Sequence, residues 1–225
     1  MQQFSTKQLV LGGCLLAFGA SFLNTGFILN TGTSVSHLTG DISRIGSGFW
    51  TSVKGDGSGV AGVVAATLGF VFGAAISGFL LHHPTLEITR PYGRILSVLG
   101  LFLVGAHFVQ HQFPIMGIVV VSAVCGSQNA LASRYRGMVL RTTHLTGLFT
   151  DFGIHIGMKL RGHHIESWKL VVPICVACSF LLGAIACSAL VFHQSAHWIL
   201  MMGAAYFSGG VIWSIWKRSK GNKVP

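Results

Sequence analysis

The sequence predicts an all-α polytopic membrane protein with about six transmembrane helices. We expect two inverted three-helix repeats, each containing a broken or re-entrant segment. Hydrophobic residues make up 51% of the 225-residue chain and charged residues only 9%, whereas about 25% of a soluble domain is charged. The tetrapeptide His-Leu-Thr-Gly occurs at residues 37–40 and again at residues 144–147. A repeat at nearly half the length of an apolar chain is typical of a transporter or channel whose halves share one site.

Six apolar runs are the candidates for transmembrane helices, and each is close to the ~20 residues that cross a hydrocarbon core of ~30 Å. The first run is too long for the apolar region of a typical signal peptide, so we expect it to remain as a membrane helix. The repeat divides the chain into a first half, residues 1–110, and a second half, residues 111–225, with three helices each. The runs cover roughly residues 8–30, 58–81, 93–110, 113–133, 169–192 and 196–216.

Two of these runs carry small residues at every fourth position, a spacing that lets two membrane helices approach closely. A Cys-x-x-Cys pair overlaps the second stripe, but a redox or metal pair needs a polar, accessible setting, and we interpret these cysteines as packing residues. The stripes consist of Ala61, Ala65, Gly69, Gly73 and Ser77, and of Cys175, Ser179, Gly183 and Cys187.

Two further segments, residues 34–53 and 142–158, are too polar for lipid-facing helices and too apolar for loops. If each enters the membrane and returns on its own side, six helices cross, and only Arg44 and Lys54 of the 15 Lys and Arg residues lie outside. If both cross fully, five arginines between residues 90 and 141 lie outside, Arg44 lies within a span, and only nine of the 15 remain inside. Because positive residues favour the cytoplasmic face, six spans with both termini cytoplasmic are favoured. The same rule explains the net charge of +10, so this charge does not indicate nucleic-acid binding.

The two tetrapeptides lie inside these broken segments. We expect Thr39 and Thr146 to be N-caps of short helices, followed by Gly40 and Gly147. The free N–H groups and positive dipole ends of the two helices would then meet near the midplane. His37 and His144 could donate or accept a proton there. Such a site suits a small anion, a weak acid or a polar neutral solute; the alternative is that both histidines only brace the broken backbone.

Acidic residues are scarce, and only Asp41 and Asp151 fall inside the broken segments. An ionisable group at membrane depth is a candidate for proton or ion coupling, because burying it unpaired is costly. Arg44 is the repeat equivalent of Asp151, so an ion pair between them across the symmetry axis is the structural alternative.

Asn24, Gln128 and Asn129 lie on the helices that precede the broken segments. Buried amides in membrane helices commonly connect neighbouring helices by hydrogen bonds. Their matched placement in the two halves makes them candidates for solute binding as well.

Nothing in the sequence indicates catalysis or a cofactor. The pairs His82-His83 and His163-His164 would need further ligands to bind a metal, and no carboxylate or cysteine pattern completes them. Nucleophile-elbow, phosphate-loop, zinc-protease and dinucleotide motifs are absent from the sequence. We therefore expect neither an enzyme nor a metal site.

The chain resembles the YoaK-like family of bacterial membrane proteins, a family of unknown function, from about residue 10 to residue 216. The resemblance rests on Asn24, on residues 38–40, on Gln-Asn-Ala at 128–130 and on Arg-Thr-Thr-His-Leu-Thr-Gly at 141–147. The last of these adds Thr142 and Thr143 to the candidate site. The resemblance implies a bacterial inner-membrane protein with about six helices. Two residues depart from the family pattern: Asn24 stands where many relatives carry Asp, and Asp41 where Asn is common.

We therefore expect an integral membrane transporter or channel for a small solute, with its site at the midplane between the repeats. Its partners would be the lipid bilayer and the solute, and the small-residue stripes would also suit a homo-oligomer. The alternative is a non-transporting membrane protein that assembles with or regulates a partner.

Overall fold

The computed structural model describes residues 5–48, 58–81, 90–131, 142–193 and 196–221, and these are helical with no strand among them. Six helices are long and apolar enough to cross a membrane, which confirms the predicted fold class of an all-α polytopic membrane protein. They are α1 (Thr6–Thr31), α3 (Ser58–Leu81), α4 (Tyr92–Val109), α5 (Pro114–Leu131), α7 (Trp168–Phe192) and α8 (Trp198–Gly221).

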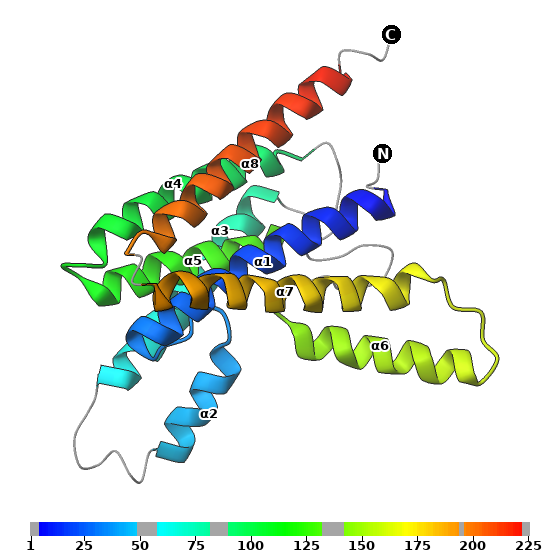
Figure 1. Ribbon diagram of the computed structural model, residues 1–225, viewed down its shortest axis with the longest axis horizontal. Helices are drawn as coiled ribbons and strands as arrows, with labels where there is room; N and C mark the ends of the chain where they lie inside the picture. Colours follow the sequence, from blue (N-terminus) through cyan, green and yellow to red (C-terminus); the bar gives the residue numbers. More distant parts are fainter. Residues whose placement is uncertain (1–4, 49–57, 82–89, 132–141, 194–195, 222–225) are drawn as a thin grey trace.

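The six long helices pack chiefly as three pairs, α1 with α7, α3 with α5, and α4 with α8 (Figure 1). Glycine sets the contact in each pair. A side chain at Gly73 of α3 would collide with the backbone of Ala123 on α5, and one at Gly183 of α7 would collide with that of Phe18 on α1. Gly100 of α4 meets the backbone of α8 in the same way. Close backbone approach of this kind stabilises helix pairs in lipid, where apolar side chains gain little from leaving the solvent.

Apolar side chains occupy both the centre and the outer surface. Leu23, Leu103, Val121 and Ile199 are fully buried and belong to one central cluster drawn from four helices. Many large apolar side chains instead point outward, among them Phe79, which is 77% exposed. A surface of this kind is expected where hydrocarbon tails replace water around the protein.

The two predicted broken segments each contain a short non-helical stretch followed by a helix. In the first half, Gly32 ends α1 in the left-handed conformation (φ 70°), and α2 (Leu38–Gly48) begins after residues 33–37. In the second half, α6 (Leu145–Leu160) begins directly after His144. Figure 1 shows α2 and α6 diverging, with α6 beside α7. Residues 49–53 of the first predicted segment lie outside the described part of the chain.

The predicted N-caps are wrong by two residues. His144 is the N-cap of α6 and makes no capping hydrogen bond with its side chain, so Thr146 is the second residue of the helix. Thr39 is likewise the second residue of α2, which begins at Leu38. The hydroxyl groups of both threonines are therefore free from a capping role.

Candidate functional site

The two His-Leu-Thr-Gly motifs meet across one cavity of about 1010 Å³. Residues 36–40 of the first half and 143–146 of the second half line it together with parts of α3 and α5. Seven of the predicted site residues contribute to this lining. They are His37, Thr39, Gly40, Asn129, Thr143, His144 and Thr146.

The cavity extends from the middle of α3 to the C-terminal ends of α3 and α5, where Leu81 and Ala130 line it. Phe70, one of its lining residues, is at the middle of α3. The ring of His37 makes an edge-on contact with Phe180, at the middle of α7, with ring centroids 5.3 Å apart. Phe70 on α3 and Phe180 on α7 thus place His37 and one end of the cavity at the middle of these two helices. Irregular backbone is tolerated at that depth only when it is buried in protein or lines a polar cavity.

A single buried amide oxygen holds the extended stretch before the first motif. Oδ1 of Asn24 accepts hydrogen bonds from the backbone N–H groups of Val35 and Ser36, both at 3.0 Å, and from the Ser34 hydroxyl at 2.8 Å. The Ser34 hydroxyl in turn accepts a hydrogen bond from the N–H of His37 at 2.7 Å. Asn24 is only 5% exposed, so these bonds supply partners to backbone groups that lack water.

Asp41 also braces this stretch. One carboxylate oxygen accepts a hydrogen bond from the N–H of Ser34 at 2.8 Å, and the other pairs with Arg44 at 3.2 Å. The Arg44 guanidinium also donates to the carbonyl of Gly32 at 2.9 Å. Asp41 and Arg44 therefore close the turn between α1 and α2, and Asp41 does not line the cavity.

The second motif is held by Asn129 instead. Its Oδ1 accepts from the Thr142 hydroxyl at 3.1 Å and from the N–H of Thr143 at 3.3 Å, and its Nδ2 donates to the Thr143 hydroxyl. Asn24 and Asn129 thus have corresponding positions in the two halves, since the side chain of each binds the residues directly before a motif. Asn129 is half-buried and also lines the cavity, whereas Asn24 lies behind it.

Gln128 connects three distant parts of the chain at the centre of the protein. Its Nε2 donates to the carbonyl of Leu16 on α1 and to the hydroxyl of Thr142, both at 2.8 Å. Its Oε1 accepts from the hydroxyl of Tyr206 on α8. Gln128 is completely buried and Thr142 is 1% exposed, so the contacts of both are with protein groups behind the cavity.

The glycines of the two motifs differ in their surroundings. A Cβ atom at Gly147 would lie 2.7 Å from Nδ1 of His144, so the imidazole folds back over the first turn of α6. Nothing lies within 4 Å of a Cβ at Gly40. Gly147 therefore gives His144 its ring position, whereas Gly40 lies at the open cavity surface.

Asp151 lies half-buried on α6 and is not among the residues that line the cavity. The bonds of Arg44 described above tie it to its own segment, to Gly32 and Asp41. The structure therefore gives Arg44 local partners where the sequence suggested Asp151 as one alternative.

Most of the residues that line the cavity from α3 and α5 are not predicted by the sequence pattern. Phe70, Ala74, Ser77 and Gly78 line it from α3, and Gly126 lines it from α5. Ser77 belongs to the small-residue stripe that predicted helix packing, and Gly69 and Gly73 of this stripe do pack against α5. The sequence signal for this wall is the polar residue Ser77 at the end of an otherwise apolar stripe of small residues.

Among the described residues no group of three His, Cys, Asp or Glu side chains is arranged to hold a metal ion. His82 and His83 lie outside the described ranges, and His163 and His164 are exposed in the turn after α6. The polar side chains of the lining are imidazoles, hydroxyls and the amide of Asn129, and they lie beside apolar side chains such as Phe70 and Leu81.

Comparison with known proteins gives a family and no function. No curated protein and no solved structure matches the chain. The model of a family described as a protein of unknown function, DUF1275, matches residues 12–212. This range covers both motifs and nearly all of the six long helices, and the chain therefore belongs to the DUF1275 family.

Proposed function

We propose that this protein is a transporter or channel for a small solute, which binds in the cavity between the two motifs. The observation that carries the proposal is that residues 37–40 and 144–146, far apart in sequence, line one cavity that reaches the middle of the spanning helices. Many membrane transporters bind their substrates in a cavity of this kind, which is lined in part by polar groups and formed by interrupted helices from both halves of the chain.

The helix pairs support an inverted repeat around this cavity. The first long helix of one half packs on the second long helix of the other, in α1 with α7 and in α5 with α3. The third long helices, α4 and α8, pack on each other. Exchanging the two halves leaves this set of pairs unchanged, as a two-fold axis between the halves requires. The proposed orientation, in a bacterial inner membrane with cytoplasmic termini, rests on the distribution of Lys and Arg.

The cavity chemistry favours a small anion, a weak acid or a polar neutral solute. The described lining residues include two imidazoles, the hydroxyls of Thr39 and Thr146 and the amide of Asn129, but no carboxylate. The N-termini of α2 and α6 lie at this lining, where free N–H groups attract negative charge. His37 and His144 would exchange protons with a weak acid, while Asp41 keeps its role in the turn.

The proposal is tested by flux into proteoliposomes. A panel of small anions, weak acids and neutral polar solutes is offered to wild type, His37→Ala and His144→Ala. His163→Ala is the matched control, because His163 is exposed in the turn after α6. We expect wild type and the control to transport one solute class, and both cavity variants to lose at least about tenfold in rate, equivalent to ~1.4 kcal/mol.

Folding of each variant is checked by size exclusion and thermal unfolding. Retention of wild-type flux in both folded cavity variants would remove the cavity from the transport path. Absence of flux for every solute by folded wild type would instead favour the alternative function, a membrane protein that regulates or assembles with a partner.

A further inference from the structure

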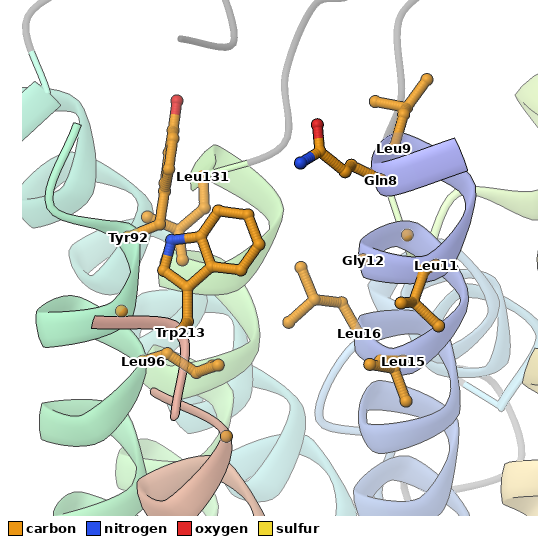
Figure 2. A pocket seen from close by; sticks show the side chains of 13 residues that line it. Gln8, Leu9, Leu11, Gly12, Leu15, Leu16, Tyr92, Leu96, Leu131 and Trp213 are labelled. Carbon is orange, nitrogen blue, oxygen red and sulfur yellow. The ribbon is translucent and has the colours of Figure 1, made fainter. Parts of the chain in front are cut away.

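A second cavity of about 250 Å³ lies between α1 and the α4–α8 pair (Figure 2). Leu11, Leu15 and Leu16 of α1 face Leu96 of α4 and Trp213 of α8 across it. It shares no lining residue with the cavity between the motifs. Its walls are almost entirely apolar, so it cannot serve the polar solute proposed above.

This cavity has one polar end and opens on the outside of the helix bundle. Figure 2 shows the Gln8 amide and the Tyr92 hydroxyl at the same end, with leucine side chains along the rest. Leu11 and Leu15 are each 63% exposed, so the opening faces the surroundings of the α1 helix. Gly12 supplies no side chain to fill the space, and nothing lies within 4 Å of a Cβ placed there.

Positive charge gathers at the polar end. Lys217 lies one helical turn after Trp213, and its Nζ donates to the carbonyl of Arg90 at 3.0 Å. Arg94 follows the lining residue Gly93 on α4 and is exposed. Basic pockets between membrane helices attract anionic lipid headgroups, whose acyl chains need an apolar groove beside them.

We propose that this cavity binds one acyl chain of an anionic phospholipid, with the phosphate beside Arg94 and Lys217. The leucines of α1 and Leu96 would surround the chain, and Gln8 and Tyr92 would meet the glycerol region. The bound lipid would fill the gap between α1 and the α4–α8 pair, which contact each other little elsewhere. This inference does not depend on the solute cavity or its function.

The test measures lipid retention on the purified full-length protein by native mass spectrometry, with phosphatidylglycerol and phosphatidylcholine of identical chains. Gly12→Leu fills the cavity from α1, and Gly209→Leu fills it from α8, where the nearest side-chain atom to a new Cβ is 4.0 Å away. Gly105→Leu is the control, because Gly105 also has open space but does not line the cavity. We expect both filling variants to lose the retained lipid and the control to keep it.

The headgroup is tested separately with Arg94→Gln and Lys217→Gln. Each should weaken phosphatidylglycerol binding about fivefold while leaving phosphatidylcholine binding unchanged. The exposed neighbour Arg218→Gln is the control and should have no such effect. Equal retention of the two lipids by wild type, or retention of phosphatidylglycerol by both folded filling variants, would overturn the proposal.

Discussion

The two His-Leu-Thr-Gly motifs line the same cavity, but the protein holds them in different ways. The first is braced by Asn24 and by the buried carboxylate of Asp41, which accept hydrogen bonds from three consecutive residues, Ser34, Val35 and Ser36. The second is braced by Asn129, which both donates and accepts. The two halves therefore share the motif, but the residues that hold the motif in place differ between them. A residue's chemistry at the cavity and its role in bracing are separable by mutation.

The largest expected losses of stability are those of Asn24→Leu and, after it, Asn129→Leu. Loss of Asn24 leaves the N–H groups of Val35 and Ser36 and the hydroxyl of Ser34 without this acceptor. Each buried unsatisfied group costs roughly 1–3 kcal/mol, so we expect a loss of about 3 kcal/mol in stability. Asn129→Leu leaves the N–H of Thr143 and the hydroxyl of Thr142 without their acceptor and should cost about 2 kcal/mol. Thermal unfolding in detergent measures both.

Substitution by aspartate sharpens the same contrast. All the bonds of Asn24 described above are accepted by Oδ1, so Asn24→Asp retains them and should unfold at a temperature well above Asn24→Leu. Asn129→Asp keeps the Oδ1 acceptor but loses the Nδ2 donor to Thr143, so it should recover only part of the loss. Equal behaviour of the two aspartate variants would show that the two supports are equivalent after all.

Smaller losses of stability are expected for two variants of the first support, Asp41→Ala and Arg44→Ala. The Asp41 side chain is 6% exposed and that of Arg44 is 67% exposed. Removing the carboxylate leaves the N–H of Ser34 unpaired and should cost about 2 kcal/mol. Removing the exposed arginine should cost at most ~1 kcal/mol, as for other solvent-exposed ion pairs. The measurement is again thermal unfolding, and a larger loss for Arg44→Ala would contradict this order.

The sequence predicts the helices and the motifs better than it predicts the supports. Apolar length is sufficient to find the six spanning helices, and the repeat is sufficient to find His37 and His144. The bonding of Asn24, Gln128 and Asp41 was not predictable, because sequence gives residue types but not the direction of an amide or carboxylate. The N-caps were misplaced because both short helices begin two residues earlier, where His144 occupies the cap without a side-chain bond. Phe70 was missed because a cavity wall on α3 has the same composition as a lipid-facing helix.

The smallest effect on stability, and the sharpest test of the comparison, comes from the glycines of the motifs. In Gly147→Ala the new Cβ would lie 2.7 Å from Nδ1 of His144, so the imidazole must move, while nothing obstructs Gly40→Ala. Alanine favours a helix by up to ~1 kcal/mol over glycine, so neither variant should unfold more easily. We expect Gly147→Ala to reduce flux severalfold and Gly40→Ala to leave it unchanged. Because both variants remain folded, an equal loss of flux would mean that the cavity responds to the volume of the motif, and not to the position of the His144 ring.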